Sequence, residues 1–268
     1  MKKFLFFIVL IGSFVSSAQE TIGLTINEDD NGVDYLLFNP ERAKKTFLID
    51  NCGYVVNEWD FDERPGLTSY LLENGNLLRA GQNNIEIRDW ENNIVWSYDI
   101  TSNGYNQHHD IEPLPNGNIL CVVHDEMQVA DAEAMGKDPN TLGNSFKMDR
   151  VIELQPVGNN DANVVWEWNF RDHLVQDFDA GKPNFGDPDV LFRKLDLNLT
   201  DGHLTDYTHV NAIDYNEELD HIILSARHTS ELYIIDHSTT TIEAAGSTGG
   251  NNGYGGDFLW RWGNIQNY

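Results

Sequence analysis

Two interleaved repeats constrain the fold of this 268-residue chain more than any other feature of its sequence. The segment 72–78 (Leu-Glu-Asn-Gly-Asn-Leu-Leu) recurs about 40 residues later at 114–120 (Leu-Pro-Asn-Gly-Asn-Ile-Leu). A second pattern, two large apolar residues followed by one or two aromatic residues, recurs at 55–61, 94–100, 164–170 and 258–264. A period of about 40 residues with several strands per unit is typical of propeller blades. Such small sheets bury one another's faces when they stack around an axis, and a central channel remains.

The rest of the chain also has an all-β pattern. Short alternating or apolar runs are separated by Gly, Asn, Asp and Pro. They predict strands at 46–50, 53–61, 76–80, 85–90, 94–100, 119–124, 151–154, 164–170, 221–225, 232–236 and 258–262. One short helix is predicted at 126–135, where Ala, Glu and Met are frequent. The sequence therefore predicts a β-propeller with about four blades.

Two longer segments, 125–148 and 171–207, interrupt the period. Long insertions in a compact all-β domain often lie over a functional face, but they can also be peripheral decoration. Both interpretations stay open for these segments.

The first 18 residues have the pattern of an export signal. Lys2 and Lys3 precede an apolar run at 4–15, and the small residues 16–18 form a cleavage site. The apolar run is too short to cross a bilayer. We therefore expect a soluble periplasmic or secreted protein in which residues 19–268 form one propeller domain.

The net charge bears on whether the protein binds nucleic acid, and the cysteine content bears on whether it contains a disulfide. The formal net charge of −26 argues against nucleic acid, because binding a polyanion needs Lys and Arg to neutralise its phosphates. The two cysteines, Cys52 and Cys121, have no spacing signature. An exported protein permits a disulfide, but buried free thiols are the simpler expectation.

A pair of histidines stands immediately before one of the Asn-Gly turns. The turn itself needs only Asn-Gly, which supplies the positive φ angles of tight hairpins, so His108, His109 and Asp110 need another explanation. Neighbouring side chains of an extended segment point to opposite faces. We therefore expect only one of the two histidines to face a given pocket, and we favour His109 because it directly precedes the aspartate.

Two further segments carry candidate groups, 206–213 with His209 and 223–232 with Arg227. The planar guanidinium of arginine matches the oxygens of sulfate, phosphate or carboxylate. Histidine acts as nucleophile, acid or base near neutral pH.

The other histidines fit ordinary surface or buried roles. This is our expectation for His124, His173, His203, His221 and His237. A metal site is the competing functional interpretation, but the ligand spacings of zinc motifs are absent, so we expect neither a metal nor a cofactor.

Together these segments resemble the bacterial arylsulfotransferase family, the PAPS-independent aryl-sulfate sulfotransferases. The motifs that match, in the family's order, are 108–111 with 114–118, then 208–213, 224–227 and 259–264. The resemblance implies a six-bladed periplasmic propeller that moves a sulfuryl group from one phenol to another without a nucleotide donor. It also implies a ping-pong reaction through a sulfohistidine.

Carried over by motif, His109 and His209 would be histidines that bind sulfate oxygens, and Arg227 would be the sulfate-clamping arginine. We add three candidate substrate-binding residues beside them, His108, His228 and Asn211. These six residues are the predicted site.

The resemblance also implies a missing part. The family's nucleophilic histidine follows the Trp-Gly-Asn element, here 262–264, and this chain has no histidine there. We therefore expect a sequence truncated at its C-terminus that, as it stands, is inactive or unfolded at its open edge. The family's cysteine pair also lies late in the chain, so Cys52 and Cys121 do not obviously correspond to it.

Two other functions stay open. A non-catalytic propeller could hold an anionic ligand or a partner protein, and the Trp-rich repeats also occur in quinone- or metal-dependent propeller dehydrogenases. The partners we expect are small phenolic sulfate donors and phenol acceptors, without nucleic acid or a membrane span. A homodimer is one open arrangement of the protein.

Overall fold

A computed structural model describes residues 34–199 and 205–264, so the expected export signal lies outside the described residues. Its strands are β1 (Tyr35–Phe38), β2 (Lys45–Asp50), β3 (Val55–Asp60), β4 (Pro65–Leu71), β5 (Leu77–Gly81), β6 (Asn84–Arg88), β7 (Ile94–Asp99), β8 (Gln107–Pro113), β9 (Ile119–Met127), β10 (Phe146–Val157), β11 (Asp161–Asn169), β12 (Leu174–Val175), β13 (Leu195–Asp196), β14 (Val210–Asn216), β15 (His221–Ala226), β16 (Glu231–Asp236) and β17 (Trp260–Gly263). The helices are short: α1 (Val129–Ala134), η1 (Pro139–Thr141), η2 (Phe170–Asp172) and α2 (Thr241–Ala244).

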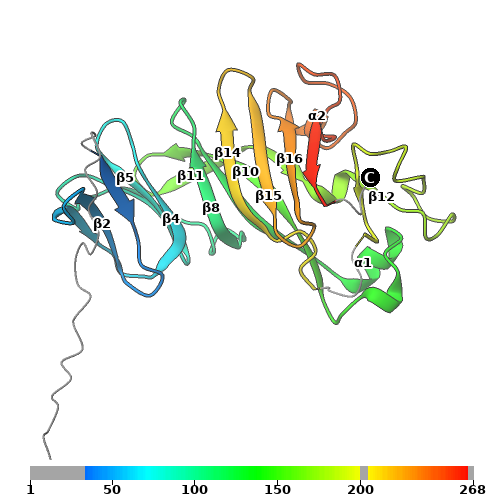
Figure 1. Cartoon of the computed structure of the whole chain (residues 1–268), viewed down its shortest axis with the longest axis horizontal. Helices are drawn as coiled ribbons and strands as arrows, with labels where there is room; N and C mark the ends of the chain where they lie inside the picture. The colour runs from blue at the N-terminus through cyan, green and yellow to red at the C-terminus, as the bar shows by residue number, and fades with distance from the viewer. Residues whose placement is uncertain (1–33, 200–204, 265–268) are drawn as a thin grey trace, which may run out of the picture.

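Consecutive strands pair antiparallel into four sheets, as the repeats predict. The strand orders are β1-β2-β3, β4-β5-β6-β7, β8-β9-β10-β11 and β14-β15-β16-β17. The sheets follow one another along the molecule (Figure 1). The first strands contact each other in turn, β1 with β4, β4 with β8 and β8 with β14. These first strands are therefore the inner strands of the blades, and the expected all-β propeller fold is confirmed.

The aromatic repeat joins each blade to the next. Trp59 in β3 donates its indole N–H to the carbonyl of Asp89 at 2.8 Å, in the following blade. Trp96 in β7 makes the same kind of bond to Asp161, at 2.9 Å. Trp168 in β11 bonds to Gly256 at 2.8 Å. Buried indoles need a hydrogen-bond partner, so one residue type supplies both apolar packing and a bond between sheets. This explains why the pattern recurs once per blade.

Among the described residues, three apolar cores fill the spaces between sheets: a small one between the first and second blades, one between the second and third, and the largest between the third and fourth. His173 belongs to the largest core, where its ring stacks on Trp168 with 5.3 Å between centroids and it bonds to Asp257 at 2.8 Å. His237 lies between the carboxylates of Glu153 and Asp220. The satisfied, ordinary role expected for these two histidines is confirmed. In the described ranges, no helix is both long and apolar enough to cross a bilayer.

Several local predictions need correction or refinement. Cys52 and Cys121 are both free thiols; Cys121 is buried as expected, but Cys52 is exposed because it sits in the turn after β2. The predicted helix 126–135 is present but shorter, as α1. The strand prediction missed β1, β4, β8 and β14, which are the four inner strands.

Candidate functional site

The inner strands β8 and β14 are irregular where the candidate histidines lie. The pairing register shifts between Gln107 and Ile111 in β8, and between Val210 and Ala212 in β14. His109 and His209 have φ of 59° and 49°. Left-handed backbone is rare for residues other than glycine and is strained, so it persists where the surrounding structure enforces it. The bulge in β8 therefore sets the direction of the His109 side chain, and the left-handed backbone just before β14 sets that of His209.

The bulge in β8 also overturns one expectation. His108 and His109 were expected to face opposite sides, but their rings lie in the same cluster, with centroids 5.2 Å apart. The physical reason is the left-handed residue, since a bulge breaks the two-residue alternation of a regular strand. Both histidines therefore belong to one site.

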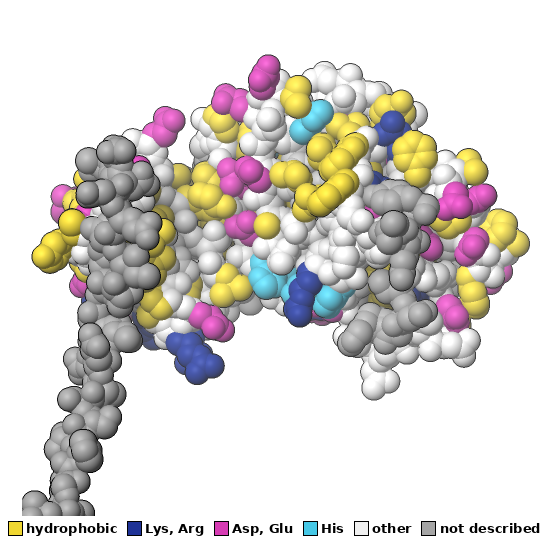
Figure 2. Space-filling model, in the orientation of Figure 1, with side chains coloured by type: hydrophobic (Ala, Val, Ile, Leu, Met, Phe, Trp, Pro, Cys, Tyr) yellow, Lys and Arg dark blue, Asp and Glu magenta, His cyan; other side chains and the backbone are white. Residues whose placement is uncertain are grey.

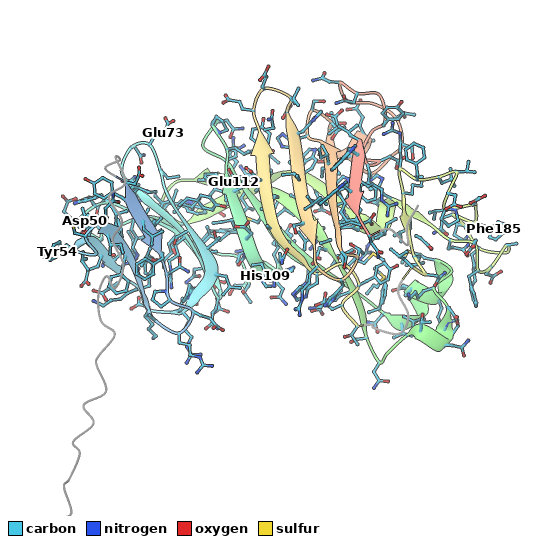
Figure 3. All side chains as sticks on the ribbon, in the orientation of Figure 1. Asp50, Tyr54, Glu73, His109, Glu112 and Phe185 are labelled. Atoms are coloured by element: carbon cyan, nitrogen blue, oxygen red, sulfur yellow. The ribbon has the colours of Figure 1, made fainter. Side chains whose placement is uncertain are left out.

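The centre of the site is a contact between two imidazoles that are far apart in the sequence. His109 Nε2 lies 3.0 Å from His209 Nε2. Figure 3 shows His109 at the lower end of β8, and Figure 2 shows histidines and a basic side chain gathered at the lower margin of the molecule. The structure thus brings these two candidates together across neighbouring inner strands.

Arg227, His228 and Asn211 flank this pair. The Arg227 backbone N–H donates to the His209 carbonyl at 3.1 Å, which sets the arginine beside it. Its side chain is exposed, and no ion pair to it occurs within residues 34–199 and 205–264. The His228 ring centroid lies 4.6 Å from that of His209. Asn211 is exposed at the β14 bulge. An arginine that carries no ion pair among the described residues is suited to an incoming anion.

Hydrogen bonds fix the protons on the central pair. His209 Nδ1 lies 2.7 Å from Asp206 Oδ2, and a carboxylate can only accept. Neutral His209 therefore carries its proton on Nδ1, and its Nε2 is an acceptor. His109 must then donate its Nε2–H across the 3.0 Å contact. Burial, with the nearby His108 and His209, lowers the pKa of His109, so this ring is neutral at pH 7.

Asp149, on β10, hydrogen-bonds to several residues of the site. Its Oδ1 lies 2.7 Å from His108 Nε2 and 3.3 Å from His124 Nδ1, and its Oδ2 accepts from Thr208 Oγ1 and Val210 N, both at 2.6 Å. Burial alone would raise the pKa of Asp149, but these hydrogen bonds hold it well below its usual range. Burial lowers the pKa of His108 despite the carboxylate. The contact is therefore best described as a neutral imidazole donating to a carboxylate.

Sequence reasoning missed four members of this cluster: His124, Lys147, Asp149 and Asp206. His124 was expected to be ordinary, but its ring stacks on His108 with 3.7 Å between centroids. Lys147 Nζ lies 2.9 Å from His124 Nε2 and 3.5 Å from Asp206 Oδ2. The pairing of β9 with β10, which puts His124 opposite Asp149, was the missing information. Only the Asp206-to-His209 spacing was visible in the sequence.

Among the residues that the structure describes, two groups of side chains could hold a metal ion, His108 with His124 and Asp149, and Asp206 with His209 and His228. In the first group the two rings are nearly parallel, at 18°, whereas the ligands around a tetrahedral ion diverge. The Lys147 ammonium also contacts His124, so a second cation there would be repelled. The hydrogen-bonded network is the better description of that group.

An open pocket of about 750 Å³ adjoins the cluster. It is formed mainly by the insertion 126–130 and 144–147, and Lys147 belongs both to its wall and to the histidine network. The insertion 125–148 therefore borders the candidate site, which favours the functional interpretation left open for it.

The opposite end of β8 carries a carboxyl group with unusual titration, Glu112 (Figure 3). Burial, together with Asp214 and Asp110, raises the pKa of Glu112 to about 7. The folded state therefore holds this proton between pH 4.5 and 7 while the unfolded state has lost it, so this group destabilises the fold as pH rises through that window.

We predict that Glu112→Gln raises the Tm at pH 8 by about 2–4 °C, since ~1 kcal/mol corresponds to such a shift in a chain of this size after solvent screening. At pH 4, where the native carboxyl is protonated, the variant and the wild type should melt within about 1 °C of each other. Thermal unfolding followed by circular dichroism at both pH values measures this. An equal shift at pH 4 and pH 8 would contradict the titration argument.

Comparison with known proteins gives the family. The model of the arylsulfotransferase (ASST) family matches residues 21–251. No curated protein matches the sequence. Among solved structures, the chain is similar to a Bacteroides caccae protein of unknown function, with 12% identity, a TM-score of 0.43, and coverage of 87% of this chain and 58% of that one. The chain thus spans a little over half the length of that protein.

Two other solved structures are similar at the same level. Kuenenia stuttgartiensis hydrazine synthase shares 12% identity with a TM-score of 0.45, over 85% of this chain and 70% of that one. The Cps50 (Swd1) β-propeller domain of Myceliophteria thermophila shares 10% identity with a TM-score of 0.37, over 86% and 69%. At these identities the likeness concerns the fold alone. The family match, by contrast, covers most of the sequence, including the histidine motifs, and the chain belongs to the arylsulfotransferase family.

Proposed function

We propose that this protein is an aryl-sulfate sulfotransferase that transfers a sulfuryl group from a phenolic sulfate ester to another phenol. One observation carries the proposal: His109 and His209 meet through their Nε2 atoms at 3.0 Å, beside Arg227, in a chain of the arylsulfotransferase family. A sulfate ester is a small oxyanion, and imidazole and guanidinium N–H groups are its natural donors.

We assign the residue roles from the negative charge that develops on the oxygens during sulfuryl transfer. The S–O bond of the donor ester breaks as a histidine nitrogen bonds to sulfur, and the phenolate leaves with a proton supplied by a histidine. In the second half, the acceptor phenol loses its proton to a base as its oxygen bonds to sulfur, and the sulfohistidine bond breaks. Fixed donors stabilise the oxygens of both transition states, which is the task we give to His109, His209 and Arg227. Splitting the transfer through a covalent histidine makes each step easier.

Three finer parts belong to the same proposal. We propose that the nucleophilic histidine is none of the nine in this sequence, as the family resemblance implies. We propose export to the periplasm or the outside of the cell, on the strength of residues 1–18. We also propose His108, His228 and Asn211 as residues that border the bound ester.

Binding to the 268-residue chain tests the anion site directly. Isothermal titration calorimetry should detect p-nitrophenyl sulfate but not p-nitrophenol at the same concentration. Since the pKa of His109 is lowered, this imidazole is neutral at pH 7 in the free site, and a bound anion favours its protonated form. Affinity should therefore rise from pH 8 to pH 5.5, with proton uptake visible as a dependence of the binding heat on the buffer. Absence of binding at every pH would overturn the proposal.

Turnover by the full-length gene product tests the reaction. Release of p-nitrophenol beyond one equivalent per enzyme should require a second phenol, and the new sulfate ester should then appear in equal amount to this further release. Binding of the sulfate ester without any transfer, across a panel of phenols, would instead establish the non-catalytic anion-binding propeller.

A further inference from the structure

We infer that Asp206 is a positioning residue for His209, which it holds in one tautomer and one orientation so that Nε2 is presented to the reacting group. Asp206 is not among the motif residues that carry the family resemblance. The inference deepens the proposed function, and its kinetic test rests on that function, whereas its spectroscopic test does not.

Contacts around Asp206 carry the inference. Its Oδ2 lies 2.7 Å from His209 Nδ1, and the two side chains are 18% and 19% exposed. Lys147 Nζ lies 3.5 Å from the same oxygen. The backbone carbonyl of Asp206 lies 2.5 Å from His228 Nδ1. One residue thus orients two imidazoles of the site, and a lysine from the pocket-forming insertion restrains it.

The second carboxylate oxygen argues against a purely structural role. Asp206 Oδ1 is buried, and it has no hydrogen-bond partner among the described residues. A carboxylate kept for stability is normally satisfied, because an unpaired buried oxygen costs free energy. Asp149 shows the contrast, since both of its oxygens accept hydrogen bonds from neighbouring strands. Asp206 therefore serves the imidazole that it contacts more than the fold.

The chemical consequence is specific to one nitrogen. With Nδ1–H committed to Asp206, the lone pair of neutral His209 lies on Nε2, where it can accept the proton of an acceptor phenol. The imidazolium formed by that proton transfer is then stabilised by the adjacent carboxylate. Without Asp206 the ring could turn or change tautomer, and Nε2 would carry the proton in part of the population.

Histidine 15N NMR on the 268-residue chain reads the tautomer directly. In the wild type we expect neutral His209 to be protonated at Nδ1 alone. In Asp206→Asn, which preserves the shape, the amide N–H can donate to Nδ1, so an Nε2–H population should appear. Asp214→Asn, which removes an exposed carboxylate of β14 beyond His209, is the matched control and should leave the spectrum of His209 unchanged. An Nε2–H tautomer in the wild type, or an unchanged tautomer in Asp206→Asn, would overturn the inference.

Kinetics of the full-length product give the second arm. Asp206→Asn should lower kcat by at least about 100-fold, as the loss of groups that orient a histidine does elsewhere. The KM for the donor ester should change much less, and Asp206→Glu should restore part of kcat. A wild-type kcat in Asp206→Asn would contradict the inference. If the wild-type protein transfers no sulfuryl group at all, the proposed function fails while the tautomer result still decides the role of Asp206.

Discussion

Replacing His209 by alanine should weaken the binding of p-nitrophenyl sulfate by about 10- to 100-fold, because a hydrogen bond to a charged group contributes ~1.5–3 kcal/mol. The variant loses the imidazole whose Nε2 lies 3.0 Å from that of His109 and which, once protonated, donates to the bound anion. In the full-length product the same change should reduce transfer below detection, since it removes both an anion contact and the proposed proton acceptor. Calorimetry and p-nitrophenol release measure the two effects.

A matched control is available on the neighbouring strand. His221 lies at the start of β15, paired with the far end of β14, and its ring contacts Asn252 instead of the site. His221→Gln should therefore bind and transfer like the wild type. Equal losses in His221→Gln and His209→Ala would indicate a general effect of removing histidines, and unchanged binding in His209→Ala would contradict the proposed site.

Replacing Asp149 by alanine should destabilise the fold by about 3–5 kcal/mol, the usual cost of removing one partner from a buried polar network. The side chain is almost fully buried, and it accepts hydrogen bonds from His108, His124, Thr208 and Val210. The change leaves these donors without an acceptor. It also removes the hydrogen bonds by which Asp149 links β10 to β8 and β14. Urea unfolding followed by tryptophan fluorescence measures the loss.

The same substitution should have a defined pH dependence. Because the folded-state pKa of Asp149 is depressed, its contribution is present above the unfolded pKa of about 3.8 and is lost as pH falls through the folded value. The difference between wild type and Asp149→Ala should thus be full at pH 7 and shrink in acid. Asp161→Ala, at an exposed strand end, should cost no more than about 0.5 kcal/mol. A loss below 1 kcal/mol for Asp149→Ala would contradict the network.

The fold was readable from the sequence because its repeats have a direct physical cause. Trp59, Trp96 and Trp168 each tie an outer strand to the next blade, so the aromatic pattern recurs with the blades. Gly75 and Gly117 adopt φ of 83° and 87° in the two Asn-Gly turns, which is why those turns keep their glycines. Local geometry of this kind requires particular residue types, so it can be recognised in a single sequence.

The inner strands have no comparable sequence pattern. β8 and β14 contain bulges and polar residues that face the site, so they lack the alternation by which the outer strands were recognised. The prediction that His108 and His109 diverge was wrong because it assumed a regular strand, whereas His109 is left-handed.

The supporting residues depend on contacts between distant strands. His124 and Asp149 face each other only because β9 pairs with β10 in one register, and Asp149 reaches Thr208 only because the third and fourth blades adjoin. Residue types and spacings along the chain do not encode such pairings.

The most direct test is a crystal structure of the 268-residue chain with p-nitrophenyl sulfate. We expect sulfate oxygens within about 3.2 Å of His109 Nε2, His209 Nε2 and the Arg227 guanidinium, the range of charge-assisted hydrogen bonds. An ester bound elsewhere, or bound between the histidines with the Arg227 side chain turned away, would contradict this expectation.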